Sequence, residues 1–455
     1  KSCATGHRSS ASGYKSCATG GCSSVFGWCS CATGACSSAF GRAAKATGGN
    51  SIAIGRNTCA TALGATASGF YSVACGIADL AIGYTAITVP YAGATNQCPE
   101  VNISIGFCTI AQNGFRCDTT TDYYLPSIAI GSCACSTRCG SLSVGICTIA
   151  SGKCSSAFGM LSCTHSYATE SIAIGFKSCA EDMHSTAVGH CSSAIGINST
   201  ASGYKSCAYT GSTASGYCVK AGGIGVGGAS AYGAKSTASG CYDIAFGNWA
   251  TTVVHAGATN KTPEANLSIG FCTKAQNGIR CGPGAGYHLP SVAIGSIACS
   301  TSCGSLSVGI CTQATGLYSS AIGYLSCATG ACSTASGYKS CATATVSSAF
   351  GWKACATANY STASGYNSFA TGVQSVAYGG SGKASGACAT SIGVNSIVSG
   401  QGATGVGYNS DATGQYSSAF GHLSDASGVA STASGYKSCA TGDYSSAFGL
   451  SSCAV

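Results

Sequence analysis

The sequence has little charge, little proline and few bulky aliphatic residues. Only 7% of its 455 residues are charged, and it contains 6 prolines, 2 methionines and 3 tryptophans. Ordinary globular domains carry about 25% charged residues, so this composition is unlike that of an average enzyme. Leucine is scarce, which disfavours long helices with bulky apolar stripes. There is no run of about 18 apolar residues, so no membrane insertion is expected.

A recognisable leader segment is also missing. The chain opens with KSCATG at residues 1–6, which already belongs to a repeat, so we expect a mature chain or a piece of a longer one. The formal net charge is +8, but the basic residues are scattered along the chain. Nucleic-acid binding needs a clustered basic stripe, so no nucleic-acid partner is expected.

No group of residues typical of an active site stands out. The 7 histidines are dispersed, with no Ser–His–Asp set and no paired carboxylates. A GxGxxG-like string occurs in GGIGVGG (Gly222–Gly228), but it lacks the strand-then-helix context of a dinucleotide site. We predict that the protein is not an enzyme and binds no cofactor.

Glycine and cysteine are abundant instead, with 67 and 34 residues. Every seventh residue from Gly6 to Gly55 is glycine, and the same spacing holds from Gly309 to Gly449 except at Ala344 and Ala358. Successive heptads alternate in character, one half reading YKSCATG or STASG and the other ACSSAFG or GNSIAIG. The true period is therefore a pair of heptads.

This repeat predicts an all-β parallel solenoid. A heptad can indicate a coiled coil, but glycine at the repeated position is a poor helix former. The segments between glycines are β-compatible, so we expect five residues of strand and a tight Gly-based turn, twice per 14-residue coil. About thirty coils stacked at roughly 4.8 Å would form a two-sided β-roll on the order of 140 Å long.

The roll has two candidate interiors. The second residue before each glycine is almost always alanine, as at Ala18, Ala39 and Ala335. Strand alternation places this alanine and the serine two residues earlier on one face, which suits a thin core. The opposite arrangement, with phenylalanine and isoleucine inside, stays open. If alanine is inside, an outer apolar row needs a cover, and a second and third copy of the chain would supply it. The trimer-interface candidates are Phe26, Phe40, Ile54, Phe350, Phe420 and Phe448.

Three pentads identify a family resemblance. NSIAIG (50–55), ESIAIG (170–175) and PSVAIG (290–295), alternating with xAxG half-repeats, resemble the head repeats of trimeric autotransporter adhesins. The resemblance implies a left-handed parallel β-roll, a homotrimer, and binding to host matrix or cells. Two features differ from the family: the chain has no counterpart of its neck, stalk and membrane barrel, and it is rich in cysteine. A fibre of a virion, a spore or another surface therefore fits as well.

An internal duplication divides the repeat. Residues 84–159 recur as 248–323, each with two inserted loops, whereas 1–83, 160–247 and 324–455 are plain β-roll repeats. Loops on a rigid scaffold are frequent binding sites, although these could also only cap a groove or order the trimer. The loop residues predicted to bind a partner are Tyr91, Asn96, Tyr123, Tyr124, His255, Asn260, Tyr287 and His288.

The cysteines predict disulfides in an oxidising environment, outside the cell or on the surface of a cell, spore or virion. Two sets of pairs compete for the same residues. Stacked coils would bring together cysteines that are one repeat apart, with about 4.8 Å between Cα atoms. The motif C-A-T-G-x-C would instead place two thiols across one turn. The stacked sets are Cys3, Cys17, Cys31 and Cys327, Cys341, Cys355; the turn pairs are Cys17/Cys22, Cys31/Cys36 and Cys327/Cys332.

A further pair is indicated by the duplication. Cys98 and Cys133 are lost together in the second copy, where Thr262 and Ile297 replace them, so we hypothesise a Cys98–Cys133 bond. The C-x4-C spacing is within the range of zinc fingers, but no histidine or second cysteine pair regularly accompanies it, so no metal is expected.

The sequence thus favours a structural extracellular fibre, a disulfide-reinforced trimeric β-roll that gives mechanical and chemical durability. The alternative is an adhesin head that binds a receptor or a surface glycan through loops 84–101 and 248–265.

Overall fold

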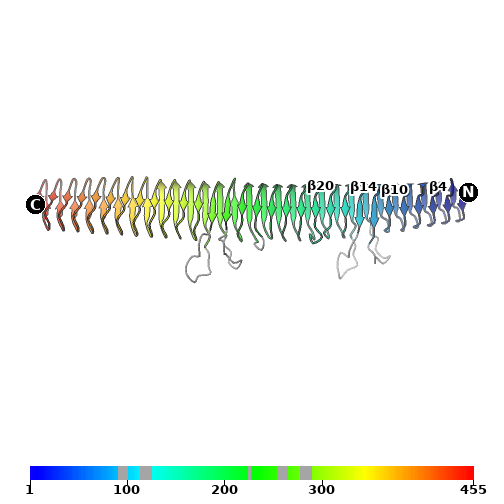
Figure 1. The fold of residues 1–455 in the computed structure, drawn as a ribbon, viewed down its shortest axis with the longest axis horizontal. Coiled ribbons are helices and arrows are strands. Elements are labelled where there is room, and N and C mark those ends of the chain that lie inside the picture. The colour runs from blue at the N-terminus through cyan, green and yellow to red at the C-terminus, as the bar shows by residue number, and fades with distance from the viewer. Residues whose placement is uncertain (91–100, 113–124, 224–226, 254–264, 277–288) are drawn as a thin grey trace. The chain divides into compact units, whose positions relative to one another are not determined.

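A computed structural model of the chain describes residues 1–90, 101–112, 125–223, 227–253, 265–276 and 289–455. They fall into two compact units, Lys1–Ile224 and Gly225–Val455, and each unit is a stack of short parallel β-strands (Figure 1). No helix in these described ranges is long and apolar enough to cross a membrane.

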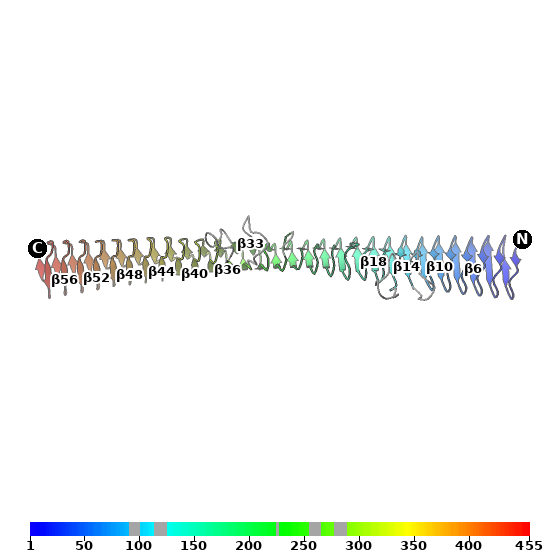
Figure 2. The same ribbon diagram turned by 90° about the horizontal axis from the view of Figure 1, so that it is seen from below.

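In the first unit, every coil gives one strand to each of two sheets. The first sheet begins with β1 (Cys3–Ala4), β3 (Cys17–Ala18) and β5 (Cys31–Ala32), and it continues with the odd-numbered strands to β29 (Lys220–Ala221). The second sheet holds the even-numbered strands from β2 (Ser10–Ser12) and β4 (Ser24–Trp28) to β28 (Thr213–Tyr217). Each strand pairs in parallel with the strand one coil later (Figure 2). In β1 and β3, for example, Cys3 is paired with Cys17.

The second unit repeats this arrangement. Its first sheet runs over the odd-numbered strands from β31 (Thr237–Ala238) to β59 (Cys453–Ala454), and its second sheet over the even-numbered strands from β30 (Ser230–Ala234) to β58 (Ser446–Phe448). The register is again one full repeat, with Cys327 beside Cys341 and Cys341 beside Cys355. The predicted all-β parallel solenoid with about 14 residues per turn is therefore confirmed.

The prediction of two five-residue strands ending at a glycine was wrong in detail. Strands of the first sheet are only two residues long, like β3, whereas β4 has five residues and continues through Gly27. The left-handed turn residue is the second one after the glycine, for example Cys22 with φ 57° and Cys29 with φ 53°. The glycine thus precedes the sharpest part of the turn.

The glycine grid is needed because neighbouring coils approach each other closely there. A Cβ on Gly20 would lie 2.0 Å from the carbonyl oxygen of Gly34, and a Cβ on Gly27 would lie 1.8 Å from that of Gly41. Gly27 also has φ +142°, a conformation that side chains with a Cβ rarely adopt. Most coils therefore have glycine at this position, and the coils of the first-sheet half-repeat with Ala62, Ala344 and Ala358 are exceptions.

Alanine fills the core, and the alternative with phenylalanine and isoleucine inside is wrong. Ala18, Ala39 and Ala335 are fully buried, as is the matching alanine of nearly every described coil. Buried serines close the turns, since the hydroxyl of Ser23 donates to the carbonyl of Gly20 at 2.7 Å. Only a few coils place a larger side chain at the alanine position, for example Val25 and Val398.

Two coils in each unit carry large insertions. Leu80 of β12 (Leu80–Tyr84) pairs with Ile103 of β14 (Ile103–Phe107), and Ile103 pairs with Ile128 of β16 (Ile128–Ser132). The second unit has the same spacing, from Ile244 to Leu267 and then to Val292. The inserted residues therefore leave the strand register intact.

Candidate interaction surfaces

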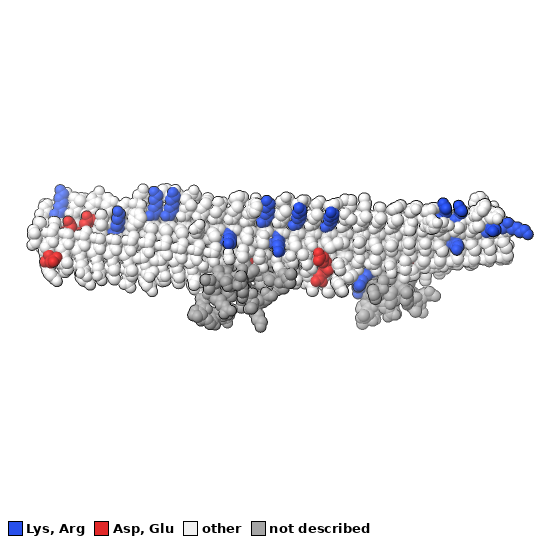
Figure 3. Space-filling model, in the orientation of Figure 1, with Lys and Arg blue, Asp and Glu red and all other residues white. Residues whose placement is uncertain are grey.

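Outward-facing side chains form columns, because every coil repeats the same positions one step further along the stack. The charged columns are short, and Figure 3 shows Lys and Arg in small groups among a largely uncharged surface. Four columns matter for interaction: an apolar row on the second sheet, two cysteine columns, and an aromatic edge with lysines.

The apolar row is exposed along the second sheet. Phe26 is paired with Phe40, and Phe40 with Ile54, so three apolar side chains stack on consecutive coils. Phe26 is 62% exposed, and Phe448 at the far end of the second unit is 67% exposed. Ile54, Phe40, Phe350 and Phe420 are exposed as well. The six candidates for the trimer interface thus share one face in each unit, and their role in a trimer stays a prediction.

The first sheet carries a column of thiols. Cys3, Cys17 and Cys31 stand side by side on β1, β3 and β5. Cys327, Cys341 and Cys355 form a second set of three, between Gln313 on one side and Phe369 on the other. All six are free thiols in the structure.

Hydrogen bonds make the three thiols of the second set unequal. The thiols of Cys327 and Cys355 lower the pKa of Cys341 by hydrogen bonding to it. The same bonds, together with burial, raise the pKa of Cys327 and of Cys355. Cys341 is therefore the thiol of this column that ionises most readily, and a thiolate is the species that forms disulfides.

The turn thiols form their own columns. Cys22 and Cys36 occupy the same left-handed turn residue on consecutive coils, and the amide of Cys36 donates to the carbonyl of Gly21 at 2.7 Å. Cys332 occupies the equivalent turn in the second unit. These three cysteines and Cys133 are free thiols. Cys98 lies outside the described residues, so the Cys98–Cys133 pair stays a prediction, as does the choice between stacked and turn pairs.

Two other cysteines are bonded. Cys139 and Cys303, which correspond to each other in the duplication, are both disulfide-bonded. All the other described cysteines are free. The sequence analysis predicted no bond at either position.

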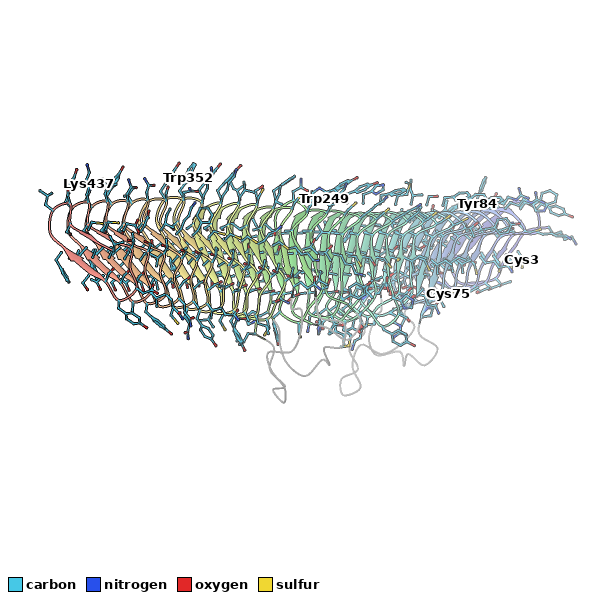
Figure 4. The ribbon with its side chains drawn as sticks, turned by 60° about the vertical axis from the view of Figure 1, so that its left-hand side comes forward. Cys3, Cys75, Tyr84, Trp249, Trp352 and Lys437 are labelled. Atoms are coloured by element: carbon cyan, nitrogen blue, oxygen red, sulfur yellow. The ribbon has the colours of Figure 1, made fainter. Side chains whose placement is uncertain are left out.

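The edge that follows the second sheet carries stacked aromatic rings. Tyr324, Tyr338 and Trp352 stack on consecutive coils, with ring centroids 5.2 and 3.8 Å apart. The lysine after the tyrosine lies over its ring, as Lys339 does over Tyr338 at 5.4 Å. Figure 4 shows Trp352 and Lys437 pointing away from the ribbon on this edge. Lys15, Lys205 and Lys437 make the same contact with their preceding tyrosine.

The predicted binding loops lie outside the described residues. This applies to Tyr91, Asn96, Tyr123, Tyr124, His255, Asn260, Tyr287 and His288. The structure does describe the positions from which these loops leave the coils.

A buried Asp–Asn pair holds the base of the first inserted loop. Asp79 accepts hydrogen bonds from the amides of Gly76 and Asn102, both at 2.8 Å. The side-chain oxygen of Asn102 accepts from the amide of Ser127 at 3.0 Å. Burial raises the pKa of the Asp79 carboxyl, although hydrogen bonds from Thr88, Asn102 and Gly76 oppose the shift.

The second copy repeats these bonds. Asp243 accepts from the amides of Gly240 and Asn266 at 2.7 Å each, and Asn266 accepts from the amide of Ser291. Sequence reasoning missed both pairs. The available signal was an aspartate three residues after a grid glycine, where the repeat usually has serine.

The described residues contain no cluster of three or more His, Cys, Asp or Glu side chains arranged to hold a metal ion. The thiol columns are linear, with one cysteine per coil, whereas a zinc site needs four ligands around a point.

Comparison with known proteins identifies the repeat. Segments of both units match the family of the YadA head domain repeat (2 copies), at residues 32–58, 167–190, 192–208, 314–340, 356–381, 399–424 and 426–452. No curated protein matches the chain. The matched segments coincide with plain coils of the solenoid, where alanine fills the core and glycine recurs. The chain therefore contains YadA head domain repeats in both of its units, and these repeats form a β-solenoid.

Proposed function

We propose that the chain is a structural fibre protein of a cell, spore or virion surface, assembled from copies of itself and without enzymatic activity. The observation that supports this most is the exposed apolar row on the second sheet. An alanine and serine core buries little apolar area per coil, so an isolated unit gains little from its own interior. Covering Phe26, Phe40 and their counterparts in a homotrimer adds the burial that the core lacks.

Oxidation of the thiol columns reinforces this assembly. Neighbouring thiols in a column lie about 4.8 Å apart at their Cα atoms, within the range of disulfides. A column of three, such as Cys327, Cys341 and Cys355, forms one bond within the chain and leaves one thiol. We expect the remaining thiol to bond to another copy of the chain, which would give the fibre its chemical durability.

The self-association is tested by replacing phenylalanine with serine in the apolar row. Serine occupies the same outward position at Ser364 and Ser434, so Phe350→Ser and Phe420→Ser suit the strand itself. With a reductant present to open disulfides between chains, we expect analytical ultracentrifugation to show trimers for the wild-type chain and monomers for the double variant. A matched control is Tyr366→Ser with Tyr416→Ser, which removes exposed aromatic rings at the turns. A wild-type chain that sediments as a monomer would contradict the proposal.

The thiol arrangement has its own pair of variants. Cys355→Ser leaves Cys327 and Cys341 as neighbours, so that column should no longer join chains. Cys341→Ser separates the two remaining thiols by about 9.6 Å, too far for a bond without backbone movement, so both should join other chains. Mass spectrometry of cross-linked peptides under non-reducing conditions distinguishes these results. Identical cross-links in both variants would contradict the pairing scheme.

The second candidate is an adhesin head that binds a receptor or glycan through loops 84–101 and 248–265. The identical Asp–Asn pairs at the base of both copies support it, because two separate units anchor their insertions with the same bonds. Deleting residues 91–99 and 255–263 shortens the first enlarged coil of each unit to the length of a plain coil. Loss of binding to cells with unchanged sedimentation would favour the adhesin, whereas unchanged binding would favour the fibre.

A further inference from the structure

A polar groove crosses four consecutive coils of the second unit. Its volume is about 370 Å³, and it lies between a column of turn residues and a column of first-sheet residues. The coil spacing of roughly 4.8 Å makes the groove about 14 Å long. Its lining residues are Asn367, Ser381, Asn395 and Asn409 from the turns, and Lys383, Ile397 and Asp411 from β49 (Lys383–Ala384), β51 (Ile397–Val398) and β53 (Asp411–Ala412).

Most polar side chains of the groove make no hydrogen bond within the fold. The four turn residues stack through their backbone amides, for example from Asn395 to the carbonyl of Gly380 at 2.8 Å. Within the described residues, the side-chain amides of the three asparagines make no hydrogen bond, and Lys383 makes no ion pair. Asp411 accepts one bond, from the amide of Ile397 at 3.2 Å. Donors and acceptors are thus left side by side for a ligand.

The charges of the groove cancel. Lys383 and Asp411 contribute one positive and one negative charge across a single intervening coil. The turn column is basic on either side, at Lys353 and Lys437, but from Asn367 to Leu423 it carries no charge. An anionic polymer would therefore be attracted to the flanking turns and not to this groove, whereas an uncharged ligand suits it.

An exposed tyrosine stands beside each end of the groove. Tyr366, 61% exposed, precedes Asn367, and Tyr408, 47% exposed, precedes Asn409. On the two coils between them the same position holds Gly380 and Val394, so the aromatic column is interrupted. Tyr408 stacks on His422 at 4.9 Å on one side, which leaves its other side toward the gap without an aromatic partner.

We infer that this groove binds an uncharged oligosaccharide. A sugar ring has hydroxyl groups around its edge, which both donate and accept, and asparagine amides do the same. It also has an apolar C–H face, for which Ile397 offers contact inside the groove, and the exposed tyrosines that precede Asn367 and Asn409 add apolar surface next to it. Neutral sugars need no net charge in the site. This inference is independent of the proposed fibre and of the loop-based adhesin, because neither uses residues 366–411.

Calorimetric titration of the full-length chain with cellohexaose, maltohexaose and chitohexaose tests the inference. At least one of the three should bind, with an affinity that stays the same between low and high sodium chloride, because the sugar carries no charge. Asn395→Ala with Asn409→Ala should weaken that binding at least about tenfold, since the two amides supply hydrogen bonds to hydroxyls. The pair of Tyr366→Ala and Tyr408→Ala should weaken it as well.

Asn57→Ala is the matched control. Asn57 occupies the same left-handed turn in the first unit with φ 58°, and Ala43 holds that turn naturally, so alanine is compatible with the coil. This variant should bind the sugar as the wild type does. The inference is overturned if none of the three sugars binds, if Asn395→Ala with Asn409→Ala leaves the affinity unchanged, or if only heparin binds and salt abolishes the binding.

Discussion

Glycine serves two different purposes at the residue scale. In the half-repeat that belongs to the second sheet, the grid glycine has a positive φ, such as +134° at Gly337. In the other half-repeat the glycine is needed only for the close approach of the next coil, and alanine replaces it at Ala62, Ala344 and Ala358. Steric contact alone is relieved by small backbone shifts, but a positive φ penalises every residue with a Cβ.

This difference predicts unequal effects of two glycine substitutions. Gly337→Ala should destabilise the chain by about 1–3 kcal/mol through backbone strain, in addition to the contact of its Cβ with Gly351. Gly330→Ala, seven residues earlier, should cost clearly less, because Ala344 occupies the same position one coil later. Denaturant titrations of both variants measure the free energies of unfolding. Equal losses would show that coil contact, and not φ, dictates the glycine grid.

At the scale of one coil, a larger core side chain on one sheet is matched by a smaller residue on the facing sheet. Val398 of β51 is fully buried where most coils have alanine, and the residue at the alanine position of the following β52 (Thr404–Val406) is Gly405. A Cβ on Gly405 would lie 2.7 Å from Cγ2 of Val398. The valine therefore fits only because the facing residue has no side chain.

A double-mutant cycle tests this compensation. Gly405→Ala should cost about 1–3 kcal/mol by overpacking, and Val398→Ala should cost about 1.6 kcal/mol for two lost methyl groups. The two together recreate the alanine pair of the next coil, Ala412 and Ala419, and should be close to the wild type in stability. Thermal or denaturant unfolding of the four proteins gives the coupling energy. Simple additivity of the two losses would contradict the packing argument.

The sequence predicted those elements that repeat and missed those that occur once or twice. The repeat period and the alanine core could be predicted because the same residue type recurs at the same position of the repeat. Gly20 and Ala18 have a counterpart in almost every coil. The strand lengths were mispredicted, since the left-handed turn falls at Cys22 and not at the glycine. The Asp79–Asn102 pair and the groove at Asn395 were missed because each depends on residues from separate coils, which no single repeat displays.

The Asp79 pair predicts a dependence on pH at the base of the inserted loop. Burial raises the pKa of Asp79 above that of the unfolded chain, so the folded state holds its proton more tightly. The stabilisation by protonated Asp79 is therefore complete at pH values below the pKa that this carboxyl has in the unfolded chain. It is lost as the pH rises through the pKa that the carboxyl has in the folded chain. Asp79→Asn should reduce the fall in melting temperature between acidic and neutral pH. Asp443→Asn, at an exposed carboxylate, serves as the control, and equal pH slopes for wild type and Asp79→Asn would contradict the prediction.

At the scale of the molecule, each strand of the described residues pairs only with strands one coil away in its own sheet. Leu80, Ile103 and Ile128 illustrate this within the first unit, where even the enlarged coils keep nearest-neighbour pairing. In such a solenoid, stability is close to a sum of coil terms and terms for neighbouring coils, because each repeat contacts mainly its neighbours. Both compact units contain their own alanine core and their own pair of sheets.

This locality predicts that each unit folds alone. Residues 1–223 and 227–455, expressed separately, should both show the circular dichroism of a β-protein and melt at about the same temperature as the full chain. Removing distant coils removes no contact from the remaining ones, although the new end exposes an unpaired strand that favours association. Sedimentation at several concentrations separates folding from such association. A fragment that stays unfolded at every concentration would mean that its coils need partners beyond their nearest neighbours.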